Sequence, residues 1–327
     1  MDFLFTQEQV ALRAMSRDLF ATLYPASRLR ELWDGAQRDP QAWRTMADAG
    51  LAGLMIPERY GGSGGTAVDL LVVGEEAGKA LVPDPLSDTA GVAVAALLGA
   101  PDDLAQRWLP AIATGDAVVA VQFDGHPFVA DADITDLLLV QRGGVLEAVE
   151  QECFTYTQVQ TEDRTRRLFA LEAGTGTPAG PAAPALGIGC LVVAAALNGI
   201  AGALLEQTVE YAKVREQFGV PIGSFQAVKH KLASVFATLE SSRAAAQLAA
   251  YAVATKQPGW ETACIVAKAH ATDAEVLANT EALQCHAGIG FTWEHDLHLW
   301  LKRGRALEHV YGSPHENRVA LAAALLD

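Results

Sequence analysis

The sequence predicts a mostly α-helical protein with a small β domain in its middle third. Three observations support this fold class. Apolar residues recur at helical spacing through the first third, short apolar runs separated by turn residues follow from about Asp116, and the last third returns to long helices with short connections. We therefore expect a helical domain over residues 1–115, a β domain over 116–184 and a helical bundle over 185–327.

Composition limits the classes of function. The chain has 327 residues, half of them hydrophobic, which is enough for two or three packed subdomains. The net charge of −15 argues against a nucleic-acid partner, which needs a basic stripe, and gives no support for binding anionic membranes. The four Cys are scattered and never form C-x-x-C, which fits a reducing cytoplasm better than disulfides or a zinc site. The opening residues 1–5 carry no basic segment, so we expect no signal peptide.

One uncharged stretch, from Ala185 to Leu205, is long enough to cross a membrane. Gly and Asn residues interrupt it, and it continues directly into the polar segment 206–211. We expect it to be a central helix of a bundle.

The first third shows several helix starts. Thr6 followed by Gln9 forms a capping-box pattern before an amphipathic run to about Tyr24. Asp39-Pro40 opens a short helix that ends before Gly50. The Gly-rich segment 57–65 has neither Walker A nor G-x-G-x-x-G spacing, so a loop leading to a helix capped at Thr66 is favoured over a phosphate site. Further helices are expected at 67–79, 90–98 and 102–113.

The middle third predicts strands at 118–121, 137–140, 145–149 and 168–171. Gly143-Gly144 is typical of a hairpin turn between two of them. The stretch from Ala173 to Pro184 is rich in Gly, Pro, Ala and Thr, which indicates a linker or an extended connection. In the last third, helices are expected at 186–214, 224–255, 260–285, 293–307 and 315–326.

The turn between the first two of these helices holds one Arg, Arg215, beside Gly219 and Pro221. A guanidinium beside a backbone turn can hold a phosphate through two hydrogen bonds. An ordinary helical hairpin with a solvated Arg explains the same residues, so the turn alone leaves both interpretations open.

Three motifs carry more information together. They are P-E-R-Y-G-G at 57–62, R-E-Q-F-G-V-P-I at 215–222 followed by F-Q at 225–226, and Q-C-H-A-G-I-G-F-T-W-E at 284–294. Their sequences and separations resemble the acyl-CoA dehydrogenase family, and the order of helical domain, β domain and four-helix bundle resembles it over the whole chain. The second and third motifs are the specific ones.

The resemblance implies FAD as a cofactor. In the family, the second and third motifs reach across a subunit interface and hold the adenosine diphosphate part of the neighbour's FAD. The residues that match are Arg215, Gln217, Phe218, Gln226, Gln284, His286 and Gly288, with Ala287 replacing the first Gly of the family's Gly pair. The implied role of Arg215 is to neutralise the pyrophosphate.

The chain departs from the family where the catalytic base is expected. The family places a Glu at one of two positions, which correspond here to Gly312 and to Gly189 or Cys190. None of these can act as a carboxylate base, so we assign no catalytic residue. The family's T-E-P-x-x-G-S-D and W-I-T-N segments are also missing, and the β domain is about half its usual length.

Three functions remain open. The favoured one is a non-catalytic subunit of a heteromeric FAD-dependent acyl-CoA dehydrogenase, because the chain resembles the short, base-less subunits of α2β2 actinobacterial enzymes of steroid degradation. A catalytic partner would then bind most of the acyl-CoA. The second is a homo-oligomeric enzyme that uses another base or carries out non-redox chemistry on a CoA thioester. The candidates for such a base are Glu294, Asp296, Glu308 and Glu316. The third is a flavin-free scaffold.

A metal site at His295 and His298, which could share a helix face, is disfavoured because no third ligand is evident.

Overall fold

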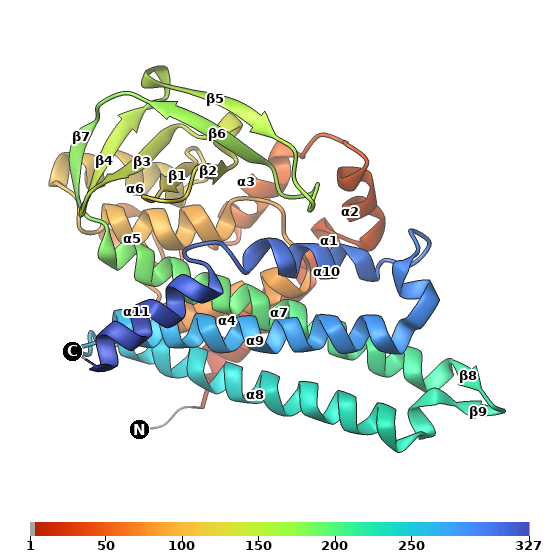
Figure 1. Ribbon diagram of the computed structural model, residues 1–327. Helices are drawn as coiled ribbons and strands as arrows, with labels where there is room; N and C mark the ends of the chain where they lie inside the picture. The colour runs from red at the N-terminus through yellow and green to blue at the C-terminus, as the bar shows by residue number, and fades with distance from the viewer. Residues whose placement is uncertain (1–3, 327) are drawn as a thin grey trace.

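The computed structural model describes residues 4–326, so part of the opening segment used for the signal-peptide expectation lies outside the described residues. Figure 1 shows a helical bundle with the β domain lying over the beginning of its central helix, and the N-terminal helices packed along the same bundle. The mostly helical fold with a small β domain is confirmed.

The N-terminal part consists of short helices that pack against α4 and against one another. Their bounds are α1 (Gln7–Leu23), α2 (Ala26–Trp33), α3 (Pro40–Asp48), α4 (Ala67–Lys79), the π-helix η2 (Leu86–Ala93), α5 (Val94–Leu97) and α6 (Asp102–Ala113). The capping box is confirmed, because Gln9 N–H donates to the Thr6 hydroxyl at 3.2 Å and Thr6 N–H donates to the Gln9 side chain at 3.0 Å. The sequence missed α2, whose N-cap is Pro25 and offers no side-chain cap. The helix predicted from residue 90 begins as a π-helix at Leu86.

The β domain has seven strands in two small sheets. The strands are β1 (Val119–Gln122), β2 (Phe128–Ala130), β3 (Leu137–Arg142), β4 (Val145–Glu150), β5 (Phe154–Val159), β6 (Leu168–Ala173) and β7 (Thr177–Pro181). One sheet has the order β1-β3-β4-β7, with β1 and β3 parallel, and the other has the order β2-β6-β5. The Gly143-Gly144 turn is confirmed, since Arg142 pairs with Val145.

Three strands were not predicted. β2 has only three residues, too few to show a strand pattern, and most side chains of β5 are exposed, so β5 shows no apolar pattern. The segment 173–184 was predicted as a linker or an extended connection, and the linker interpretation is wrong: β7 lies within it and pairs with β4.

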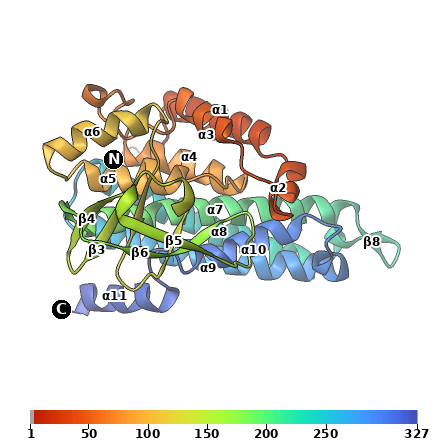
Figure 2. The same ribbon diagram turned by 90° about the horizontal axis from the view of Figure 1, so that it is seen from above.

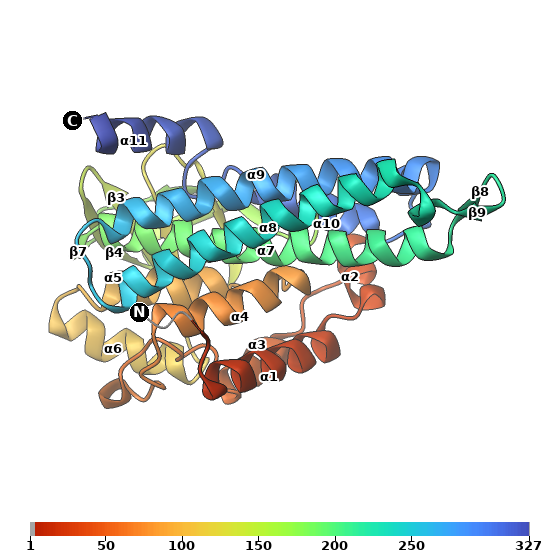
Figure 3. The same ribbon diagram turned by 90° about the horizontal axis from the view of Figure 1, so that it is seen from below.

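The C-terminal bundle is formed by α7 (Ala183–Val214), α8 (Gln226–Ala254), α9 (Trp260–His286) and α10 (Leu297–Leu307), with α11 (Pro314–Leu326) alongside. Figure 3 shows α7, α8 and α9 running side by side, and Figure 2 shows α7 between them and the N-terminal helices. α10 begins at Leu297 rather than at residue 293. His295 therefore precedes the helix, and the expectation that His295 and His298 share a helix face is wrong.

α7 is the centre of the molecule. It is long and apolar enough to cross a membrane, but 89% of its most apolar window is buried inside the protein, as expected for a core helix. Glycines let α4 approach it closely: a Cβ on Gly78 would lie 2.2 Å from Ala196 O, and one on Gly199 would lie 2.0 Å from Glu75 O. Any larger residue at these positions would push the two helices apart.

The three regions share one core, since a single cluster of buried apolar residues includes side chains from the N-terminal helices, β1, β3, β4 and the bundle. Two buried ion pairs tie the β domain to the helices. Arg303 of α10 pairs with Asp163, and Arg38 pairs with Asp131. The β domain is therefore fixed in position over the bundle.

Candidate functional site

The turn at Arg215 is a β-hairpin that projects past the end of the bundle. Strands β8 (Glu216–Gln217) and β9 (Val220–Pro221) pair antiparallel, and Figures 1 and 3 show the hairpin extending beyond α7, α8 and α9. Its two turn residues, Phe218 and Gly219, have φ of 57° and 78°. A positive φ at both central residues gives the twist that two-residue hairpins need. The Phe218 side chain is 93% exposed at the tip.

Polar side chains without partners gather at this end of the bundle. Arg215 follows α7, Gln226 begins α8 and Gln284 lies in the last turn of α9; all three are exposed. Within residues 4–326, none of these three side chains has a hydrogen bond or ion pair. Their hydrogen-bonding groups are thus available to a ligand or to another chain.

The loop after α9 has an unusual backbone. Ala287 has φ 52° and ψ −135°, a conformation that favours Gly. The neighbouring Gly288 is exposed, and a Cβ added to it would meet nothing within 4 Å. Another molecule can therefore approach the Gly288 backbone closely.

His286 lies beneath this loop rather than on the surface. It is 2% exposed, its ring stacks on Tyr211 with centroids 4.3 Å apart, and its Nδ1 is 2.8 Å from Ala282 O. Its Nε2 is buried and has no partner in the described part of the chain. Burial lowers the pKa of His286. Of the seven predicted cofactor-binding residues, His286 is the one in the interior, where it supports the loop.

A second cluster lies after α10, at Tyr311 and Gly312, whose φ values are 56° and 103°. Their carbonyl oxygens accept hydrogen bonds from buried side chains: Cys190 Sγ donates to Tyr311 O at 3.6 Å, and Lys268 Nζ donates to Gly312 O. Burial lowers the pKa of Lys268 to about 8 and raises that of Cys190 to about 11. These contacts hold the segment in one conformation.

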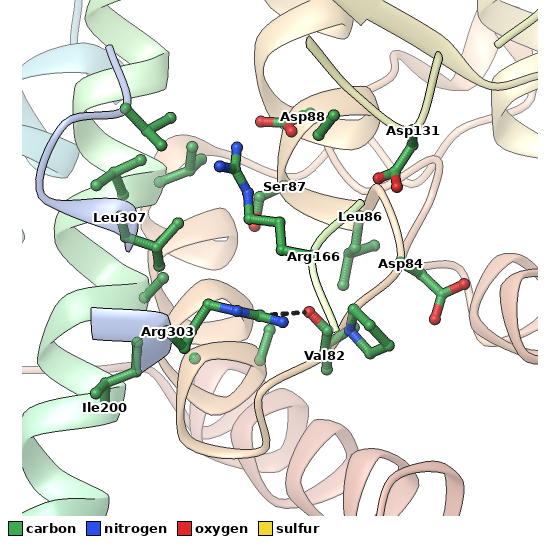
Figure 4. A pocket seen from close by; sticks show the side chains of 18 residues that line it. Val82, Asp84, Leu86, Ser87, Asp88, Asp131, Arg166, Ile200, Arg303 and Leu307 are labelled. Carbon is green, nitrogen blue, oxygen red and sulfur yellow. Dashed lines mark hydrogen bonds between the residues drawn. The ribbon is translucent and has the colours of Figure 1, made fainter. Parts of the chain in front are cut away.

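Two cavities lie between the β domain and the helices beside this segment. The one in Figure 4 has a volume of about 70 Å³ and is lined by α4, α7, α10 and the segment 82–88. The second, of about 240 Å³, is lined mainly by apolar residues of the β domain and by Tyr311. Asp88 and Arg166 line both, and the Tyr311 hydroxyl donates to Asp88. Neither residue was a candidate in the sequence analysis.

Two family models match the chain. The model described as "Acyl-CoA dehydrogenase, N-terminal domain" covers residues 6–116, and the one described as "Acyl-CoA dehydrogenase, C-terminal domain" covers residues 182–326. The chain belongs to the acyl-CoA dehydrogenase family.

Known proteins are similar over the full length. "Acyl-CoA dehydrogenase IpdE2" of Mycobacterium tuberculosis is 36% identical over 93% of this chain and 94% of its own. "Acyl-CoA dehydrogenase FadE34" of the same organism is 32% identical over 94% of this chain but only 46% of its own. Among solved structures, the "Tcur3481-Tcur3483 steroid ACAD G363A variant" is 25% identical with a TM-score of 0.89, covering 98% of each chain. The "ChsE4-ChsE5 complex from Mycobacterium tuberculosis", at 22% identity and a TM-score of 0.90 over 100% of this chain and 99% of its own, shows the same fold.

In this acyl-CoA dehydrogenase fold, Gly189 and Gly312 both lie close to neighbouring side chains, and Cys190, the alternative to Gly189, is buried. A Cβ on Gly189 would lie 2.8 Å from the Tyr311 ring. Gly312 has φ 103°, and its Cβ would lie 2.7 Å from Asn317 Oδ1. A larger residue at either position would therefore require its neighbours to shift.

The four carboxylates considered as substitute bases lie in different places. Glu294 and Asp296 precede α10, whereas Tyr311 follows it, so the helix, about 16 Å long, separates them from the Tyr311 segment. Asp296 pairs with Arg30, and Glu308 pairs with Arg305 at 2.7 Å.

Glu316 lies closer, in a cleft of about 360 Å³ that Gly312 also lines. The Glu316 carboxylate accepts a hydrogen bond from Ser313 N–H at 2.7 Å and interacts with the Ser313 hydroxyl, and both contacts lower its pKa. A lowered pKa makes a carboxylate a weaker base.

The hairpin end of the bundle suits the adenosine diphosphate part of FAD. It offers a free guanidinium at Arg215, free amides at Gln226 and Gln284, an exposed ring at Phe218 and an unobstructed backbone at Gly288. A pyrophosphate needs the cation, and a flat base can pack on the ring.

Proposed function

We propose that the chain is a subunit of a heteromeric, FAD-dependent acyl-CoA dehydrogenase. It supplies the half-site for the adenosine diphosphate part of an FAD held mainly by a catalytic partner. The partner supplies the base and binds most of the acyl-CoA. The reaction is α,β-dehydrogenation of a CoA thioester, and we propose a steroid-derived acyl group.

The observation that carries this proposal is the difference between the two ends of the bundle. At one end, Arg215, Gln226 and Gln284 are exposed and have no partner among the residues that the structure describes. At the other, Gly189 and Gly312 carry no carboxylate, and a side chain at either position would require its neighbours to shift. The chain is thus equipped to hold part of a cofactor and not to take the substrate's α-proton.

The role of each residue follows from its chemistry. The FAD, when bound, accepts the hydride from the substrate. Arg215 binds the pyrophosphate, and a guanidinium can do so through two parallel hydrogen bonds. Gln226 and Gln284 offer amide groups that orient the cofactor, Phe218 covers it from water, and Gly288 lets it approach the backbone. Gln217 is tied to the hairpin by its bond to Glu216 O at 2.8 Å, which leaves its carbonyl oxygen for the ligand.

The relatives support a two-chain enzyme in three ways. The name of the structure at 25% identity joins two proteins and describes them as a steroid ACAD. This chain matches 46% of FadE34, so the rest of that polypeptide is long enough to hold a second unit of similar size. The alignment with the "Probable acyl-CoA dehydrogenase YngJ" of Bacillus subtilis spans 381 positions, more than the 327 residues of this chain, as expected for a shortened subunit.

Purification of the chain alone and with its co-expressed partner tests the proposal. We expect the chain alone to be colourless and inactive. The complex should be yellow and should oxidise an acyl-CoA when an electron acceptor is supplied. A yellow homo-oligomer that oxidises an acyl-CoA without a partner would overturn the proposal and favour a substitute base. A colourless complex would favour a flavin-free scaffold.

A further inference from the structure

Arg166 has a half-buried guanidinium that lines two cavities. The residue lies just before β6, and its backbone is fixed by a bond from its N–H to Asp163 O at 3.1 Å and one from the Thr161 hydroxyl to its carbonyl at 3.2 Å. The side chain is half-buried, and its guanidinium makes no hydrogen bond or ion pair to any residue of the described range 4–326. Figure 4 shows it reaching into the cavity near Leu307 and Asp88, with no dashed line to a neighbour.

Most of the acidic residues around Arg166 already have other partners. Asp131 pairs with Arg38, Asp163 pairs with Arg303, and Asp84 accepts a hydrogen bond from the Tyr24 hydroxyl. Asp88 accepts the Tyr311 hydroxyl through Oδ1, while its Oδ2 has no partner within residues 4–326. A half-buried guanidinium without a hydrogen-bond partner is costly, so a hydrogen-bond acceptor from outside the chain, such as a carboxylate, would be stabilising.

The cavity beside Arg166 is apolar and of useful size. Its volume is about 240 Å³, and its apolar walls are Val121, Phe123, Phe128, Val129, Leu168 and Val310. An apolar cavity of about 150 Å³ can hold benzene, so this one has room for a saturated ring with a substituent. His126, His309 and the Tyr311 hydroxyl complete the polar part of its lining. A second cleft of about 490 Å³ shares Phe128, Arg166, Leu168 and Ala306 with it.

We propose that this cavity binds a compact hydroxy acid. The ligand's carboxylate accepts hydrogen bonds from the Arg166 guanidinium, its hydroxyl donates to Asp88 Oδ2, and its hydrocarbon body lies against the apolar walls. An anion without a hydroxyl would leave Asp88 Oδ2 unpaired, and a neutral alcohol would leave the guanidinium unpaired. The site belongs to this chain alone and does not depend on the flavin half-site at Arg215.

Titration calorimetry with three probes that share one carbon skeleton tests the proposal. The sample is the purified chain, or its complex with the partner if the chain is purified in that form. The probes are cis-4-hydroxycyclohexanecarboxylate, cyclohexanecarboxylate and cyclohexanemethanol. We expect saturable binding, with the hydroxy acid tighter than the plain acid and the alcohol at least tenfold weaker than either, because hydrogen bonds to charged groups are the stronger ones.

Three variants locate the site. Arg166→Gln should weaken the binding of both acids at least tenfold and abolish the preference for acid over alcohol. Its matched control is Arg164→Gln, which removes an exposed Arg two residues away that lines neither cavity and should bind as the wild type does. Ala306→Phe, which fills the cavity from α10, should block all three probes.

The proposal is overturned if the wild-type chain shows no saturable binding, or if the alcohol binds as tightly as the acids. It is also overturned if Arg166→Gln binds the acids as the wild type does. If Arg166→Gln does not fold, the acid–alcohol comparison on the wild type and the Ala306→Phe variant decide the matter.

Discussion

Gly189 of α7 lies directly against the ring of Tyr311, and a Cβ on Gly189 would stand 2.8 Å from two of the ring carbons. The ring is fixed from other directions as well. It packs edge-on against Phe123 with centroids 5.5 Å apart, and its hydroxyl donates to Asp88. Tyr311 therefore fills the space that a longer side chain at residue 189 would need.

Replacing Gly189 with Ala should destabilise the chain, because neither the buried ring nor the helix can move aside freely. Overpacking of this kind costs about 1–3 kcal/mol in the free energy of unfolding, and the better helix propensity of Ala offsets about 1 kcal/mol of this loss. Urea unfolding measures it, with Gly144→Ala as the control, since a Cβ there would meet nothing within 4 Å. Equal stability of the two variants would show that the contact is not tight.

Replacing Ala287 with Gly should stabilise the chain. Ala287 has φ 52° and ψ −135°, and a non-Gly residue in such a conformation costs about 1–3 kcal/mol. The greater entropy of Gly in the unfolded chain offsets part of this gain, so we expect a net increase of about 1 kcal/mol in the free energy of unfolding. The matched change Ala244→Gly, at an exposed site in α8, should instead lower it by about 1 kcal/mol. A loss of stability in both variants would contradict the assigned backbone.

Glu275 gives the stability a specific pH dependence. It is fully buried against Gly304, and Asn279 donates a hydrogen bond to its Oε1 at 3.1 Å. The charged groups that act on it are Glu308 and Arg305. Burial raises its pKa from 4.5 to about 8. Between these two values the folded state binds a proton that the unfolded state has released, so the free energy of unfolding falls as the pH rises.

The variant Glu275→Gln should lack this decline. Relative to the wild type, it should gain about 2–4 kcal/mol in the free energy of unfolding between pH 4.5 and pH 8. Urea unfolding of both proteins across this range measures the difference. A constant difference between them would mean that Glu275 is ionised in the folded protein at neutral pH.

Much of the fold could be predicted because helices of the first third have marked starts and those of the last third are long runs separated by only a few residues. Thr6 and Thr66 cap helices where expected, and α6 spans its predicted residues. The elements that were missed lack such signals. α2 has no side-chain cap, β5 is mostly exposed, and β7 lies in a Gly- and Pro-rich segment where only pairing with β4 makes a strand.

The site could be predicted only in part. The motifs located the hairpin and the loop after α9, yet a linear pattern does not show which side chains point inward, and His286 is buried. Arg166 gave no signal at all, because Arg164, Arg166 and Arg167 are neighbours in one polar run. Only the fold shows that Arg167 pairs with Asp133 at 2.6 Å, that Arg164 is exposed and that Arg166 reaches into a cavity.

The central claim, that this chain holds part of its partner's FAD through Arg215, is tested most directly by flavin retention in the co-expressed complex. The measurement is the amount of FAD that remains per complex during dilution, for the wild type, Arg215→Ala and the control Lys213→Ala. Lys213 is an exposed cation two residues away that pairs with Glu210 at 2.6 Å. We predict that Arg215→Ala weakens FAD binding by about 1–3 kcal/mol, the scale of a lost charged hydrogen bond, while Lys213→Ala retains FAD as the wild type does. Unchanged retention in an intact Arg215→Ala complex would contradict the assignment of this half-site.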